Sequence, residues 1–184
     1  MQTTRLKLRQ WIPTDMKPFA DMNADSEVMK YFPATLNELE SNALFERIVS
    51  RIAENGWGLW ALELADTHEF IGFTGLNKPW FDLPFCPCVE IGWRLMRKHW
   101  GKGYATEAAN KALEFAFENL SLDEVVAFTP VANFASQAVM KRIHMNDTRE
   151  NFLHPAIPSG NSLQEHLLFR ITAPEWKHSR QQSR

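Results

Sequence analysis

Gly101 and Gly103 flank Lys102 directly before a helix predicted over residues 104–119, and this arrangement can bind an anion. The first amides of a helix have no partners inside it, and glycines have no side chains to keep a ligand away. The helix dipole adds positive charge at the same end. The turn therefore favours a phosphate group, with a plain tight connection as the alternative.

Two common phosphate motifs do not fit this turn. A Walker loop needs Gly-x-x-x-x-Gly-Lys-Ser/Thr, which GKGYATEA does not supply, and a dinucleotide fingerprint needs a third glycine where Thr106 stands. A pyrophosphate held by backbone amides remains as the interpretation. The residues expected to hold it are His99, Trp100, Gly101, Lys102, Gly103, Tyr104 and Ala105.

A glutamate inside a predicted strand is the second chemical candidate. Along VEIGWRL, alternation places Glu90, Gly92 and Arg94 on one face of the strand and the apolar residues on the other. A carboxylate in mid-strand can act as a general base. An ordinary solvent-facing glutamate, or a partner of Arg94, is the alternative.

Composition limits the function classes. The 184 residues are 45% hydrophobic and 23% charged, which suits a single domain, and a net charge of -2 offers no basic field for nucleic acid. There is no signal pattern and no apolar run of about 20 residues, so we expect a cytoplasmic protein that does not bind membranes. Cys86 and Cys88 are expected to be reduced, and no metal is expected.

The hydrophobic pattern predicts alternating strands and helices, with antiparallel strands first and a mixed sheet overall. We expect strands at 5–11, 57–64, 69–77, 88–96, 123–131 and 166–172, and helices at 14–23, 26–31, 35–55, 104–119 and 133–144. Thr35 and Glu38 have the spacing of a capping box for the third helix. Residues 151–161 are expected to be a loop, residues 1–175 one domain, and residues 176–184 a frayed tail.

The stretch VEIGWRLMRKHWGKGYATEAANKALEFAF, followed by VVAFTPVANFASQAVMKRIHM, resembles the GNAT superfamily of acetyl-coenzyme A (acetyl-CoA) dependent N-acetyltransferases. Within it, the chain is similar to the type that acetylates ribosomal-protein N-termini, and the resemblance covers most of the sequence. It implies a mixed α/β fold: a mostly antiparallel sheet of six to seven strands, helices on both faces, and a splayed central strand pair. It also implies acetyl-CoA as co-substrate and an amine as acceptor.

The resemblance also implies roles for individual residues. Backbone groups of Leu95, Met96 and Arg97 would pair with the pantetheine arm, near a thioester beside Trp93. Glu90 would be the base. Asn133 would bind pantetheine, and Ser136 would protonate the leaving thiolate, because Met140 stands where many members have a tyrosine. Lys98 departs from the usual first residue of the phosphate motif.

Substrate contacts are expected from Tyr31, Trp93 and His154. An α-amine has a pKa of about 7.7 to 8.0, against about 10.4 for lysine, so a site with a single candidate base suits a peptide or protein N-terminus. Alternatives are a small or antibiotic-like amine, or a non-catalytic acyl-CoA-binding regulatory module. We expect direct attack in a ternary complex rather than a cysteine relay, by a monomer or homodimer.

Overall fold

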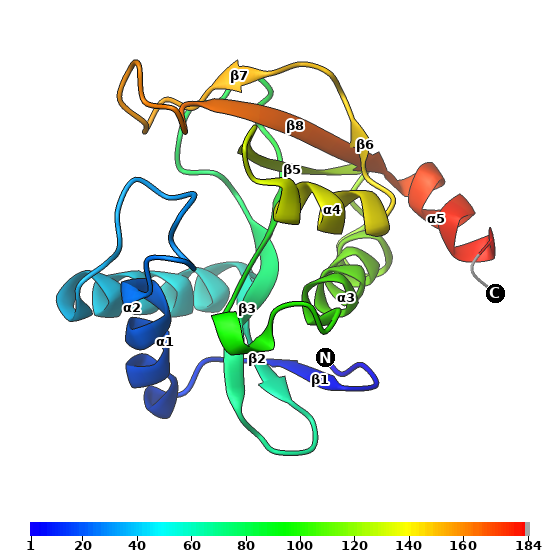
Figure 1. Cartoon of the computed structure of the whole chain (residues 1–184). Coiled ribbons are helices and arrows are strands. Elements are labelled where there is room, and N and C mark those ends of the chain that lie inside the picture. The colour runs from blue at the N-terminus through cyan, green and yellow to red at the C-terminus, as the bar shows by residue number, and fades with distance from the viewer. Residues whose placement is uncertain (183–184) are drawn as a thin grey trace.

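The computed structural model describes residues 1–182, which form one eight-stranded sheet with helices packed against it (Figure 1). The strand order is β1-β2-β3-β4-β5-β8-β6, and β7 pairs with β8. The strands are β1 (Leu6–Arg9), β2 (Leu59–Leu64), β3 (Phe70–Asn77), β4 (Glu90–Leu95), β5 (Glu124–Pro130), β6 (Asn146–Asp147), β7 (Phe152–Leu153) and β8 (Glu165–Thr172). The helices are α1 (Met16–Ala24), α2 (Glu38–Asn55), α3 (Tyr104–Glu118), α4 (Phe134–Arg142) and α5 (Ala173–Gln182), with short 3-10 turns η1 (Pro13–Asp15) and η2 (Arg97–His99).

The central strands β4 and β5 separate soon after they meet. They run parallel and share a single register pair, Glu90 opposite Val126, whereas every other strand pair is antiparallel. The predicted mixed α/β sheet with a splayed central pair is therefore confirmed. The sheet has more strands than the six to seven expected because β6 and β7 are two-residue strands, and β7 lies within the predicted loop 151–161.

Helices cover both faces of the sheet, as the burial of its central strands requires. Every residue of β3 except the last is buried, so both of its faces need cover. Figure 1 shows α1 and α2 on one side of the sheet and α3, with α4 beside it, on the other. On α3, Ala108, Ala112 and Ala116 are fully buried, and their small side chains let the helix approach the sheet closely.

Two predictions before α2 are wrong. Residues 26–31 form consecutive turns instead of a helix, and the Asp25 carboxylate accepts hydrogen bonds from the amides of Glu27 and Val28. The capping box of α2 is also two residues later than predicted. Asn37 accepts from the Glu40 amide at 2.9 Å, and the Glu40 carboxylate accepts from the Asn37 amide at 2.9 Å.

The predicted frayed tail is wrong for residues 176–182, which belong to α5. Trp176 is 4% exposed, and its ring centroid lies 5.3 Å from that of Phe117 on α3. Arg180 adds an ion pair with Glu114 at 2.9 Å. One buried tryptophan thus holds a helix whose own apolar pattern is weak. The remainder of the predicted tail, residues 183–184, lies outside the described residues.

Within residues 1–182, none of the helices combines the length and the apolar character that crossing a membrane requires. The same residues contain no cluster of three or more histidine, cysteine, aspartate or glutamate side chains arranged to hold a metal ion.

Candidate active site

The glycine turn before α3 presents unpaired amides outward. Gly101 and Gly103 have φ values of 73° and 80°, the left-handed region that glycine adopts without strain. The first helical bond runs from the Glu107 amide to the Gly103 carbonyl at 3.0 Å, which leaves the amides of residues 104–106 without intrahelical partners. A Cβ atom added to Gly101 would meet nothing within 4 Å, so the space above the turn is open.

Fewer backbone amides are free to bind an anion than the predicted range from His99 to Ala105 contains. The His99 amide donates to Met96 O at 2.9 Å and the Trp100 amide donates to Arg97 O at 3.1 Å. Both amides are therefore used inside η2 and its end. His99 is buried, with 5% of its surface exposed. Of the predicted residues, those whose amides stay open to an anion are residues 101–105.

The segment just before β1 holds the turn in place, which the sequence did not indicate. Arg5 donates through Nε to Glu107 Oε2 at 2.6 Å and through Nη1 to the Lys102 carbonyl at 2.9 Å. Its guanidinium also lies 4.7 Å from the ring centroid of Tyr104. Thr3 completes the brace by donating to Glu107 Oε1 at 2.5 Å. The Lys98 side chain does not join these contacts, because it pairs with Glu69, directly before β3.

The direction of the backbone groups of β4 follows from two hydrogen bonds. Met96 N donates to Ile71 O on β3 at 2.9 Å, so the even-numbered residues of β4 bond to β3. The odd-numbered residues face β5, as the bond from Val126 N to Val89 O at 3.0 Å shows. Because β5 then diverges, the backbone groups of the later odd-numbered residues face the gap.

These groups belong to Trp93 and Leu95. The Leu95 carbonyl accepts from the Trp100 indole at 2.8 Å, so the groups left open are both backbone groups of Trp93 and the Leu95 amide. An extended chain with amide groups, such as pantetheine, can pair with such an edge. The Met96 amide and carbonyl are both occupied, and the Arg97 carbonyl is too, so the open edge lies slightly earlier in β4 than predicted.

Glu90 lies at the point where β4 and β5 part, directly opposite Asn77 on β3. Burial raises the pKa of its carboxyl to about 7, and a hydrogen bond from the Asn77 side chain acts in the opposite direction. A carboxylate with this pKa suits a general base at neutral pH. The described residues contain no ion pair between Glu90 and Arg94, so that alternative does not apply.

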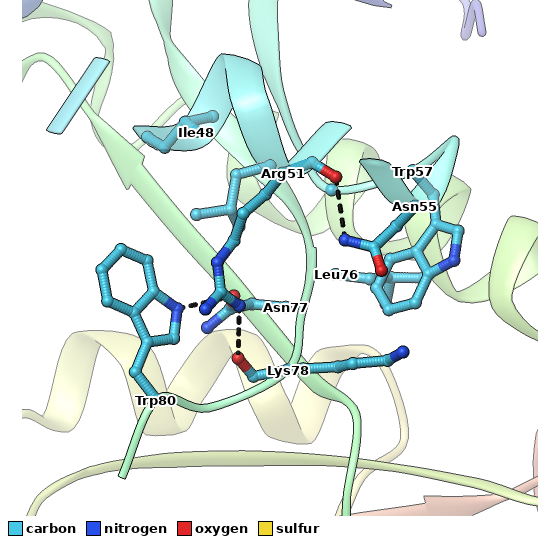
Figure 2. Close-up of a pocket in the computed structure, with 10 residues that line it drawn as sticks. Ile48, Arg51, Asn55, Trp57, Leu76, Asn77, Lys78 and Trp80 are labelled. Atoms are coloured by element: carbon cyan, nitrogen blue, oxygen red, sulfur yellow. Dashed lines mark hydrogen bonds between the residues drawn. The ribbon is translucent and has the colours of Figure 1, made fainter. Parts of the chain in front are cut away.

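Asn77 links Glu90 to a small cavity between the end of α2 and the segment after β3 (Figure 2). Asn77 Oδ1 accepts from the Trp80 indole at 3.2 Å, and Arg51 donates to the Lys78 carbonyl at 3.0 Å. The cavity volume is about 20 Å³, enough for a single water molecule and too small for an acceptor. The acceptor must therefore approach from elsewhere along the face that carries Glu90.

Arg94 lies farther along that same face of β4. Its Nη1 donates to Asn23 Oδ1 at 2.6 Å, and its guanidinium lies 4.1 Å from the Phe32 ring centroid and 5.3 Å from that of Phe73. Burial lowers the pKa of Arg94 to about 10. From the segment YFP, the structure thus brings Phe32 to this face, while the half-buried Tyr31 ring lies 5.8 Å from the Lys30 ammonium.

Asn133 and Ser136 contact each other at the start of α4. Asn133 caps the helix by accepting from the Ser136 amide at 3.2 Å, and it donates to Ser136 Oγ at 3.1 Å and to Thr129 Oγ1 at 2.9 Å. Both amide protons of Asn133 are therefore used, whereas the hydroxyl proton of Ser136 donates to no described residue. Met140 is buried in the core, with 2% of its surface exposed. Its thioether has no proton to donate.

His154 belongs to an aromatic cluster between β7, β8 and the segment after β3. Its ring lies 5.1 Å from that of Phe81 and 4.9 Å from that of His166. Burial lowers the pKa of His154, and its Nδ1 accepts from the Ala156 amide at 3.2 Å, so the neutral ring carries its proton on Nε2. The described contacts of His154 do not include Glu90 or Ser136.

The two cysteines are free thiols, with their sulfur atoms 3.6 Å apart. Burial and the neighbouring Cys86 raise the pKa of Cys88 to about 12. A thiol with such a pKa is protonated at neutral pH and is a poor nucleophile. This chemistry argues against Cys88 as the nucleophile of a cysteine relay.

Comparison with known sequences finds one family over most of the chain. The profile of the acetyltransferase (GNAT) domain matches residues 5–146. The uncharacterized N-acetyltransferase YnaD of Bacillus subtilis is 31% identical over 175 residues, covering 95% of this chain and 97% of that protein.

Solved structures have the same fold. An acetyltransferase (GNAT family) from Bacillus anthracis superposes with a TM-score of 0.79 at 25% identity, covering 95% of this chain and 98% of that one. Spermidine N-acetyltransferase from Vibrio cholerae, in complex with CoA and spermine, gives 0.73 at 18% identity and covers 95% and 99%. Ribosomal-protein-S5-alanine acetyltransferase from Vibrio fischeri gives 0.75 at 16% identity and covers 96% and 97%.

Proposed function

The chain belongs to the GNAT acetyltransferase family, and we propose that it transfers acetyl from acetyl-CoA to the α-amine of a peptide or protein N-terminus by direct attack in a ternary complex. The observation that carries this proposal is the divergence of β4 and β5 after Glu90, beside a glycine turn with open amides. These two features lie at opposite ends of one stretch of chain from Glu90 to Ala105. They suit the extended arm and the pyrophosphate of one acyl-CoA molecule.

The proposed roles follow the geometry of the open groups. The amides of residues 101–105 would hold the pyrophosphate, and Trp93 with the Leu95 amide would pair with pantetheine. A backbone amide facing the gap, that of Trp93 or Leu95, would polarise the thioester carbonyl. The amides of Gly92 and Arg94 are unsuitable for polarising the thioester carbonyl, because the backbone groups of these residues are directed toward β3.

The transfer needs two proton movements. Glu90 would accept the proton of the attacking amine, directly or through a water molecule, as the nitrogen bonds to the thioester carbon. The bond from carbon to sulfur then breaks, and the thiolate takes a proton. Ser136 would pass this proton to the sulfur and regain one from solvent in the same step, because its hydroxyl proton is free, while Asn133 fixes the position of its oxygen.

The pKa of Glu90 supports an α-amine as acceptor. A base with a pKa of about 7 can remove a proton from an amine whose pKa is about 7.7 to 8.0 far more readily than from lysine at about 10.4. Small primary amines can be acetylated by the same reaction. Proteins with this fold are named for both kinds of acceptor: spermidine in one case and a ribosomal protein in another.

Calorimetric titration with acetyl-CoA, and with CoA, ATP and NAD for comparison, is the first test. It is followed by thiol release with a panel of peptide N-termini. Binding selective for acetyl-CoA together with peptide-dependent release is the expected result. Selective binding without release from any amine would indicate an acyl-CoA-binding regulatory module, and failure to bind acetyl-CoA would overturn the cofactor site.

A further inference from the structure

Arg94 is a cation without a carboxylate partner. Within residues 1–182 it forms no ion pair; its single hydrogen bond is the one from Nη1 to Asn23 Oδ1, at 2.6 Å. Its Nε is closed off from solvent and has no hydrogen-bond partner at all. A partly buried guanidinium normally meets a carboxylate or phosphate, because the charge loses hydration that another group must replace.

The side chain is nevertheless held in place. Asn23 is fully buried, and its Nδ2 donates to Ser41 Oγ at 2.9 Å, which directs Oδ1 toward Arg94. Phe32 and Phe73 provide the aromatic surroundings described above. The buried Nε cannot reach a ligand, but Nη2 has no hydrogen-bond partner among the described residues and is not closed off from solvent. Because the side chain is already held in place, Nη2 can donate to an anionic group at low entropic cost.

The space beside Arg94 belongs to the proposed acceptor side. Glu90, Gly92 and Arg94 alternate onto one face of β4, so Gly92 separates the proposed base from the cation. A Cβ atom at Gly92 would meet nothing within 4 Å. The face therefore offers an open position with a base on one side and a guanidinium on the other, each about 7 Å along the strand.

Two further cations contact Trp80, which is hydrogen-bonded to the neighbour of the proposed base. Arg47 and Arg51 each lie 4.3 Å from the ring centroid of Trp80, the residue that donates to Asn77 opposite Glu90. Figure 2 shows Arg51 and Trp80 side by side. In the described part of the chain, neither arginine forms an ion pair with a carboxylate. This surrounding charge favours an anionic molecule and opposes a polycation.

We propose that the acceptor is a primary amine that also carries a carboxylate, and that Arg94 binds this carboxylate while the amine lies above Gly92 next to Glu90. The inference rests on the proposed transferase function and specifies a second group that the acceptor carries besides its amine. Two sources share this chemistry: a free amino acid-like molecule, and a peptide whose first residues include aspartate or glutamate. Spermidine, which has amines and no carboxylate, does not fit.

Matched acceptor pairs test the proposal by thiol release. One pair is an amino acid and its carboxamide, another is a peptide beginning with glutamate and the same peptide beginning with glutamine, and spermidine is the polycation. Rates are compared per concentration of neutral amine, because a nearby carboxylate changes the amine pKa. We expect kcat/KM to favour the carboxylate member on the order of tenfold to a hundredfold, which is typical of a hydrogen bond to a charged group.

Arg94→Gln separates recognition from folding. The variant should lose the preference for the carboxylate member, raise KM more than it lowers kcat, and leave acetyl-CoA binding unchanged. Arg94→Lys keeps the positive charge but lacks the planar guanidinium, so it should recover part of the preference for carboxylate. It replaces Arg94→Gln in the test if the glutamine variant does not fold. Arg142→Gln, on the exposed end of α4, is the matched control and should behave as the wild type.

The two proposals fail in different ways. Acetylation of amines without a preference for carboxylate, or a preference that survives in Arg94→Gln, overturns the role of Arg94 and leaves the transferase intact. If no amine is acetylated, the transferase proposal fails. The role of Arg94 is then decided by calorimetric binding of the same pairs to the CoA-bound protein. Binding of the carboxylate member that depends on Arg94 supports it, and equal or absent binding refutes it.

Discussion

Glu90 and Asn77 lie directly opposite each other in the antiparallel ladder of β3 and β4, at the place where β4 parts from β5. Burial raises the pKa of the glutamate to about 7, and the asparagine hydrogen bond works against that rise. The protonation state of the proposed base near neutral pH thus depends on a residue on another strand.

Glu90→Gln should lower kcat/KM by about 100-fold at pH 7, the lower end of the range for losing a general base. In the wild type, kcat/KM should rise with pH through about 7 as the carboxyl loses its proton. The variant should lack this inflection and keep only the one that belongs to the amine. The pH profile of kcat/KM is the measurement, with acetyl-CoA affinity as the control. A profile that keeps its inflection near 7 would exclude Glu90 as the base.

Asn77→Leu should move the same inflection to higher pH. The hydrogen bond from Asn77 lowers the pKa of Glu90, so its removal leaves burial unopposed. Asn55→Leu is the matched control, because Asn55 lines the same cavity in Figure 2 but donates to the Arg51 carbonyl of its own helix at 2.8 Å. Equal profiles for the two variants would contradict a link between Asn77 and the base.

Much of the architecture could be predicted from local pattern. The alternation in VEIGWRL and the apolar spacing of α3 depend on neighbours a few residues away, so the strand, the helix and the glycine turn were predictable. The capping box was misplaced because Thr35-x-x-Glu38 and Asn37-x-x-Glu40 both have the required spacing, and only the folded chain distinguishes them.

The parts that could not be predicted depend on contacts distant in sequence. The pairing of Arg5 with Glu107 spans 102 residues, and the position of Asn77 opposite Glu90 requires the register of β3 against β4. The helix α5 at the end of the described chain also depends on a contact that is distant in sequence. Trp176 stabilises α5 through Phe117 on α3, a contact that no local window of sequence contains. The lack of a carboxylate partner for Arg94 likewise emerges only from the assembled fold.

Asn133 and Ser136 should separate into a structural and a chemical residue. Asn133→Ala removes the cap of α4 and should lower the free energy of unfolding by about 1 kcal/mol, while Asn133→Ser restores most of it. Ser136→Ala should instead lower kcat by about 100-fold. Thermal unfolding and steady-state rates are measured on the same samples. Full activity in Ser136→Ala would mean that water protonates the thiolate.

The glycine turn offers a test that separates ligand binding from backbone strain. Gly101 and Gly160 both have left-handed φ values, 73° and 83°, and a Cβ atom at either would meet nothing within 4 Å of the protein. Alanine at each position should therefore cost a similar 1 to 2 kcal/mol, about the penalty for an L-residue in that region. Only at Gly101 would the added methyl group occupy the space above the open amides.

We therefore expect Gly101→Ala to weaken acetyl-CoA binding roughly tenfold or more by calorimetry, because the methyl group keeps the pyrophosphate from the amides. Gly160→Ala should leave that affinity unchanged while lowering the melting temperature to a similar extent. If both variants bind acetyl-CoA as the wild type does, the pyrophosphate does not lie on this turn. If both weaken binding equally, the loss comes from general destabilisation, and the open amides of residues 101–105 have no special part in it.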